Sequence, residues 1–141
     1  MNLPDINRVA MKLWLRERQV GWDALTDAER AVLITVVLWN EVGNGGFHQY
    51  YYNSSGNDAL EAPEAFRKIR AAKIAKVVQK ANRLFGTSGP DRDQSKRQAQ
   101  LAGLSEESIQ KMESLDSLVY DDFYLELRMM EFAGKNGMSD E

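Results

Sequence analysis

Apolar residues recur along much of this 141-residue chain at intervals of three and four, the spacing that aligns side chains on one face of a helix. The pattern predicts a first helix over about 4–20, with Pro4 in its first turn. A second helix is predicted from 28 to 42, because Thr26 and Glu29 have the spacing of a capping box. This second helix is apolar on nearly all sides, which indicates a buried, central position.

Glycines at 43, 45 and 46 predict that the central helix ends there, and the following FHQYYYN predicts about two further turns. From 63 to 85 the pattern predicts an amphipathic helix with a kink near 70–72. Its apolar stripe faces one way, and a basic stripe lies on another face. The basic stripe consists of Lys73, Lys76, Lys80 and Arg83.

The last third of the chain predicts a loop at 86–92, a helix capped by Ser105, and a final helix that begins at Asp116 or Asp121 and ends at Gly134. We expect the tail at 134–141 to be frayed. No segment shows the alternation typical of a strand. The fold class predicted is therefore all-α, a single domain over 1–141 with six to seven helices around one buried central helix.

The net charge of −3 conceals a strong asymmetry along the chain. Residues 1–61 carry a net −3, residues 62–100 a net +7 and residues 101–141 a net −7. Two interpretations remain open. The basic and acidic segments either neutralise each other within the fold or form two surfaces that face different partners.

Several classes of function lack the residues that they require. The chain has no cysteine and one histidine, so thiolate metal sites are excluded, and histidine catalysis would have to use His48. The GNGG run at 43–46 follows a helix and lacks the Lys-Ser/Thr of a phosphate-binding loop. We therefore predict a protein that is not an enzyme and that binds no cofactor and no metal.

Binding to nucleic acid or to a membrane is not expected either. The basic face at 67–97, including Arg92, Lys96 and Arg97, could contact phosphates, but the isoelectric point near 5.3 argues against direct nucleic-acid binding. The longest apolar run, from Ala31 to Trp39, is far shorter than the ~20 residues of a membrane span. No apolar stretch of the signal-peptide type opens the chain, so a cytoplasmic location is expected.

The segment from Trp39 to Gly56, WNEVGNGGFHQYYYNSSG, concentrates glycines, amides, aromatics and the one histidine. Its core resembles the E-V-x-N-G-G-F-x-Q-Y…N-S-x-G signature of the bacterial DNA-mimic protein family, and the similarity extends over about 25–133. The residues that carry this structural signature are Glu41, Asn44, Gly45, Gly46, Phe47, Gln49, Tyr50, Asn53 and Gly56. We interpret the segment as a conformational corner whose amides satisfy backbone groups and whose aromatic rings pack inward.

The resemblance implies an all-α bundle, often dimeric, that acts by occluding a protein partner. In the DNA-mimic type, surface carboxylates stand in for DNA phosphates and block a DNA-binding regulator. The carboxylates that would do so here are Asp116, Asp121, Asp122, Glu126 and Glu131. An immunity protein that neutralises a bacterial toxin by direct binding is the alternative. An enzyme that uses His48 or the polar Gly-rich loop is a third, less favoured hypothesis.

Overall fold

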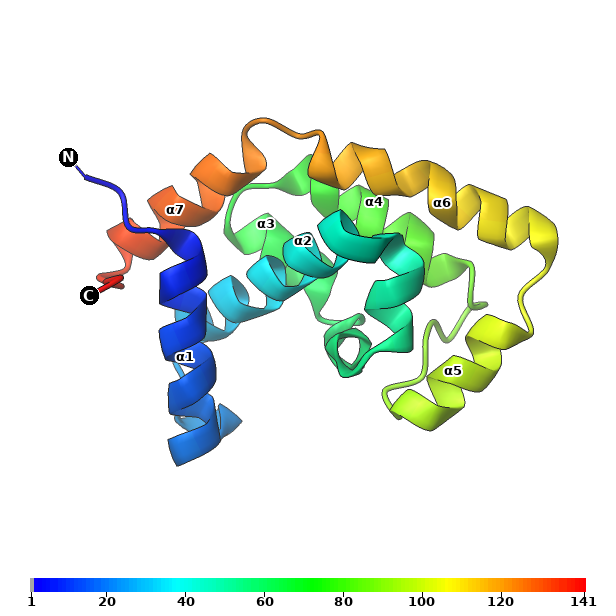
Figure 1. Ribbon diagram of the computed structural model, residues 1–141, viewed down its shortest axis with the longest axis horizontal. Coiled ribbons are helices and arrows are strands. Elements are labelled where there is room, and N and C mark those ends of the chain that lie inside the picture. Colours follow the sequence, from blue (N-terminus) through cyan, green and yellow to red (C-terminus); the bar gives the residue numbers. More distant parts are fainter. Residues whose placement is uncertain (1) are drawn as a thin grey trace.

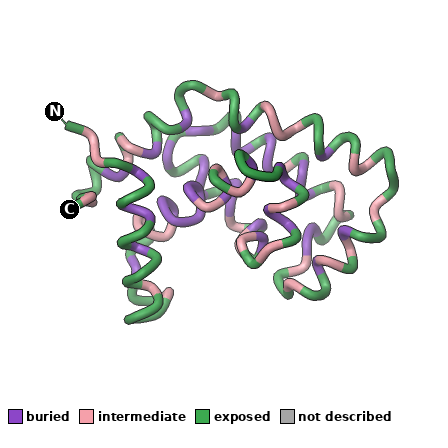
Figure 2. Tube along the Cα trace, viewed as in Figure 1, coloured by how far each residue is buried: buried purple, intermediate pink, exposed green. Residues whose placement is uncertain are grey.

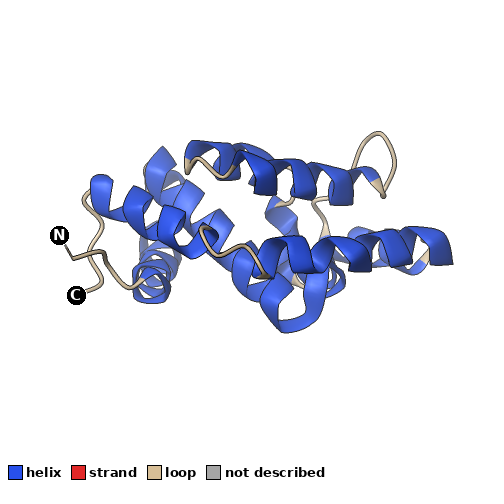
Figure 3. Cartoon of the chain, turned by 90° about the horizontal axis from the view of Figure 1, so that it is seen from above, coloured by secondary structure: helices blue, strands red, loops and turns tan. Residues whose placement is uncertain are grey.

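The computed structural model describes residues 2–141, and this part of the chain consists of helices joined by short loops (Figures 1 and 3). Residues 2–141 contain seven α-helices and two 3₁₀ turns: α1 (Ile6–Val20), η1 (Trp22–Ala24), α2 (Asp27–Tyr52), η2 (Ser54–Asp58), α3 (Ala62–Lys68), α4 (Ala72–Arg83), α5 (Gln94–Ala102), α6 (Glu106–Tyr120) and α7 (Leu125–Lys135). The predicted all-α class, the helix number and the single domain are confirmed.

The helix α2 is the centre of the fold, as its apolar sequence predicts. The expected capping box is present: the Glu29 N–H donates to the Thr26 hydroxyl at 3.1 Å, and the Thr26 N–H donates to the Glu29 carboxylate at 2.9 Å. Five of the other helices, α1, α3, α5, α6 and α7, pack against α2. Buried residues accordingly line α2 from Ala31 to Val42 (Figure 2).

The predicted end of the central helix at residue 42 is wrong. Gly43 and Gly45 continue the helix, and only Gly46 leaves helical geometry, with φ 77° and ψ −178°. The chain kinks at Gly46 and resumes helical geometry from Phe47 to Tyr52. A glycine permits a helix to end but does not compel it, so the position of the kink depended on what packs against each glycine.

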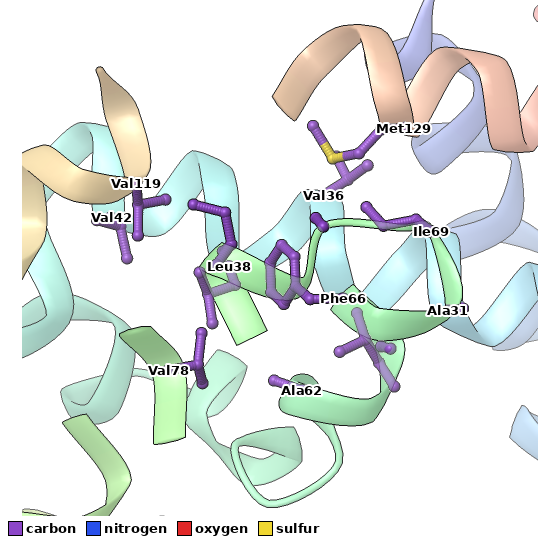
Figure 4. Packing of buried hydrophobic residues seen from close by; sticks show 14 of the residues in the cluster. Ala31, Val36, Leu38, Val42, Ala62, Phe66, Ile69, Val78, Val119 and Met129 are labelled. Carbon is purple, nitrogen blue, oxygen red and sulfur yellow. The ribbon is translucent and has the colours of Figure 1, made fainter. Parts of the chain in front are cut away.

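The predicted kink near 70–72 is a full break between α3 and α4. Arg70 adopts a left-handed conformation with φ 68°, and the Ala71 N–H donates back to the Phe66 carbonyl at 2.8 Å, a Schellman-type helix end. The apolar stripe is buried as predicted from Phe66 to Ala81, and Figure 4 shows Phe66 among the other core residues. The side chains labelled around it are Ala31, Val36, Leu38, Val42, Ala62, Ile69, Val78, Val119 and Met129.

The apolar pattern did not predict α5, because only Leu101 among its nine residues is a large apolar side chain. Its start is marked by Asp93, whose carboxylate accepts from the Lys96 N–H at 2.9 Å. The next helix begins after Ser105, as expected.

The C-terminal tail, for which we expect fraying, makes specific contacts with the N-terminal part of the chain. The Asp5 N–H donates to the Asp140 carboxylate at 2.6 Å, and the Lys12 ammonium donates to the Ser139 carbonyl at 3.0 Å. The tail therefore lies against α1, and both termini are at the same end of the molecule (Figure 1).

Candidate protein-binding surface

The half-buried side chain of Asp116 packs against the kink in α2. Its carboxylate accepts from the Phe47 N–H at 2.8 Å, so it caps the short helical segment that restarts after Gly46. A side chain at Gly46 would collide with this carboxylate. Burial raises the pKa of Asp116, and the Phe47 hydrogen bond opposes that rise. Asp116, a predicted partner-binding residue, is thus already engaged in the fold.

The amides of the Gly-rich segment bind a carboxylate rather than the backbone, contrary to our expectation. Glu41 accepts from the Gln49 amide at 2.7 Å and from the Asn53 amide at 3.3 Å. The Asn44 side chain is exposed and makes no hydrogen bond to any residue that the structure describes. Gln49 also fills the space over Gly45, where a Cβ would overlap it. These contacts tie the two halves of α2 together across the kink.

Three aromatic residues of the same segment pack inward as predicted, but Tyr52 is 52% exposed, contrary to the prediction. Phe47, Tyr50 and Tyr51 are fully buried. The Phe47 and Tyr51 rings stack at 6.1 Å between centroids, and Tyr51 meets Phe85 edge-on at 4.6 Å. The Tyr51 hydroxyl donates to the Asn82 side chain at 2.7 Å. This region is therefore part of the core, and its exposed residue His48 lies beside Asp116.

Arg97 supports the end of this segment, and sequence reasoning misplaced it on the basic face. Its side chain is 0% exposed. The guanidinium donates to the carbonyls of Tyr51 at 2.6 Å and Asn53 at 2.8 Å, and to the Asn57 side chain at 2.9 Å. It also donates to the carbonyls of Asp91 and Arg92. A side chain at Gly56 would overlap it, which explains the glycine there. The role of Arg97 is structural.

The α6–α7 connection presents exposed aromatic and acidic side chains together. Phe123 is 94% exposed and Tyr124 65%, and both lie next to Asp121 and Asp122 in sequence. Soluble proteins seldom expose neighbouring aromatic rings of this size unless they bind something. The connection lies at the upper edge of the molecule in Figure 1. We call residues 118–127 the α6–α7 surface.

The structure brings together only some of the five predicted carboxylates. Asp121 and Glu126 are exposed on the α6–α7 surface, and Asp122 is half-buried there, accepting from the Tyr124 N–H at 2.9 Å. Glu131 lies farther along α7, on an open groove of about 460 Å³ whose other charged residues are basic. Those basic residues are Lys68, Arg70, Arg128 and Lys135. The sequence signal that could have identified the α6–α7 surface was the presence of Phe123 and Tyr124 among acidic residues at the junction of two helices.

The acidic and basic segments do not neutralise each other by direct ion pairs. Within residues 2–141 no ion pair joins α4 to α6 or α7, although α4 packs against α6. The basic stripe Lys73, Lys76, Lys80 and Arg83 is exposed. Of the two interpretations left open above, the structure therefore favours two separate charged surfaces.

No helix in the described part of the chain combines the length and apolarity needed to cross a membrane. Within residues 2–141 there is also no group of three or more His, Asp or Glu side chains placed to hold a metal ion.

A small helical protein whose exposed surface carries acids beside aromatic rings is suited to binding another protein. The model of the DMP19-like protein family matches residues 23–136, so the chain belongs to that family. The match agrees with the DNA-mimic resemblance and with the span of about 25–133 expected for it. No curated protein and no solved structure matches the chain.

Proposed function

We propose that this protein is a non-catalytic antagonist that binds a DNA-binding protein through the α6–α7 surface and thereby blocks DNA binding. Membership of a family of DNA-mimic proteins is the observation that carries the proposal. The carboxylates of Asp121, Asp122 and Glu126 on this surface are the groups that would occupy phosphate-binding positions on the partner.

The exposed aromatic residues modify the simple picture of phosphate mimicry. Three carboxylates cannot reproduce a long run of DNA phosphates, and the net charge of the chain is only −3. Phe123 and Tyr124 supply apolar contact area, which adds affinity that salt does not screen. We therefore expect binding in which charge steers the approach and the aromatic rings anchor the complex.

Affinity capture from the native host with the wild-type protein as bait tests this function. A matched control bait carries Glu106→Gln and Glu107→Gln, two acids in the first turn of α6 outside the α6–α7 surface. A bait with Asp121→Asn and Asp122→Asn should lose the captured protein, whereas the control bait should keep it. The captured protein should bind DNA alone and release it when the wild-type protein is added. A captured protein whose DNA binding is unaffected, or binding that neither moderate salt nor the Asn changes weaken, refutes the proposal.

Neutralisation of a toxin is the second candidate, and the exposed aromatic residues favour it because a toxin surface need not be basic. In that case the partner would be encoded by an adjacent gene and would be toxic when expressed alone. Growth of cells that co-express both proteins distinguishes the candidates, since a DNA-binding regulator needs no neutralisation. A homodimer, implied by the family resemblance, is also proposed, and light scattering on the purified protein measures it.

A further inference from the structure

A groove of about 430 Å³ lies between α1, η1, α2 and η2, and none of its lining residues comes from α6 or α7. Two indole rings, Trp14 and Trp22, form part of its wall, together with apolar side chains of α2. Ser54, Ser55 and Asn57 add polar groups from the turn that follows α2. The groove is therefore a surface distinct from the α6–α7 surface described above.

The charged residues that line this groove are all acidic: Glu17, Glu41 and Asp58. The Glu41 carboxylate is engaged by two side-chain amides. Within residues 2–141 the carboxylates of Glu17 and Asp58 form no hydrogen bond and no ion pair. Burial, and then the nearby charges of Glu61 and Glu17, raise the pKa of Asp58, and the charges of Arg92 and Arg97 oppose that rise. Among the described residues, the groove thus contains two carboxylates without an ion-pair partner, and no basic side chain lines it.

The two tryptophans make the groove suitable for a planar cation. An indole face attracts cations, and a guanidinium group can also stack on it. The chain's own side chains already use these rings in this way. The Arg18 guanidinium lies 4.7 Å from the Trp14 ring centroid, and that of Arg30 lies 5.6 Å from the Trp22 centroid. An external guanidinium would find the same aromatic chemistry together with unpaired carboxylates.

We propose that this groove binds an arginine side chain of the protein partner, with the guanidinium paired to Glu17 and Asp58 beside the two indole rings. The assignment of this arginine to the protein partner rests on the proposed function, because proteins that bind DNA carry arginine on their DNA-binding surfaces. The chemistry of the groove does not depend on the α6–α7 surface. Carboxylates match the fork of donors on a guanidinium, which an ammonium group lacks.

Nuclear magnetic resonance of the ¹⁵N-labelled full chain, titrated with N-acetyl-arginine amide, tests the proposal directly. The indole N–H resonances of Trp14 and Trp22 should shift in a saturable way, with a Kd on the order of 1 mM. Trp39, which does not line the groove, is the internal control. N-acetyl-citrulline amide has nearly the same shape without the charge and should produce no saturable shift.

Two variants and a matched control assign the carboxylates. Glu17→Gln and Asp58→Asn should each weaken binding of the arginine probe by about tenfold. Glu106→Gln, which removes an exposed acid on α6, should leave it unchanged. Circular dichroism on each variant checks that the helices remain folded.

Equal responses to the arginine and citrulline probes, or an unchanged Kd in both groove variants, would overturn the proposal. If N-acetyl-lysine amide bound as tightly as the arginine probe, the groove would be a general cation site, and the proposed preference for arginine would be wrong. A preference for free L-arginine over the capped amide would indicate a metabolite site instead of a protein contact. The Asp121→Asn, Asp122→Asn variant should still bind the arginine probe. The arginine site and the proposed antagonist function can therefore be tested independently of each other.

Discussion

The buried guanidinium of Arg97 provides the sharpest test of how this fold is stabilised. Replacement by methionine keeps an unbranched apolar stem but removes all five donated hydrogen bonds. Their acceptors, four backbone carbonyls and the Asn57 side chain, would remain. A buried acceptor left without a donor costs about 1–3 kcal/mol. Water can reach some of these carbonyls, so we expect a total loss of about 3–5 kcal/mol rather than the full sum.

This loss is a large part of the stability of a typical domain, about 5–15 kcal/mol. For a chain of this size it corresponds to a fall in Tm of roughly 10–15 °C. Urea denaturation followed by circular dichroism measures the free energy of unfolding of Arg97→Met. Lys96→Met is the matched control, because Lys96 is the preceding residue of α5 and its side chain is exposed. The control should change the free energy of unfolding by less than about 0.5 kcal/mol.

Arg97→Lys tests whether the charge or the fork of donors matters. Lysine keeps the charge but has three donors on one nitrogen, which cannot reach acceptors on both sides of the guanidinium. We expect a free energy of unfolding between those of the wild type and Arg97→Met. A loss below about 1 kcal/mol for Arg97→Met would refute the reasoning, since it would mean that the carbonyls find other donors at little cost.

Three further variants test other parts of the structure. Gly46→Ala should destabilise the protein by about 2–4 kcal/mol in urea denaturation, because a Cβ at positive φ is strained and collides with Asp116. The control Gly43→Ala should be neutral or stabilising by up to about 1 kcal/mol. Equal effects at the two glycines would contradict the assignment of the kink to Gly46. Phe123→Ser should leave Tm unchanged but weaken partner binding at least tenfold, measured by calorimetry; a fall in Tm would show instead that the ring supports the fold. Asp58→Asn should raise Tm at pH 7, because the raised pKa of Asp58 means that its ionised carboxylate destabilises the folded state. This gain in Tm should vanish below about pH 4, where Asp58 is protonated in the folded and unfolded states alike. A gain that persisted at low pH would point to packing rather than charge.

The helices with strong local signals were predictable from sequence. The capping box at Thr26 and Glu29 satisfies backbone groups within one turn, so its partners are fixed by spacing alone. The stripe around Phe66 is likewise a local periodic pattern, and it is buried as predicted. The helix α5 was missed because a short polar helix is stabilised by contacts with distant parts of the chain, here through Arg97.

The candidate site was predictable only in part. Asp121, Asp122 and Glu126 lie on one surface because they are close in sequence at a helix junction. Asp116 and Glu131 belong to the same acidic segment but not to that surface. Asp116 faces a backbone N–H on α2, and Glu131 lies among basic residues of α3 and α7. The surroundings of Asp116 and Glu131 could not be predicted from the periodicity of the acidic segment, because they are formed by other parts of the chain.

By itself the sequence determined the helical class, the central apolar helix and the family resemblance, because each depends on residues near one another along the chain. The tertiary structure alone decided which of three glycines bends α2, and that Arg97 is buried while Lys96 is exposed. It also decided that, within residues 2–141, no ion pair joins the basic stripe of α4 to α6 or α7. The physical reason is the same in each case. A steric clash, a buried hydrogen-bond donor or an ion pair depends on the atoms that the residue contacts, and these atoms come from elements far away in the sequence.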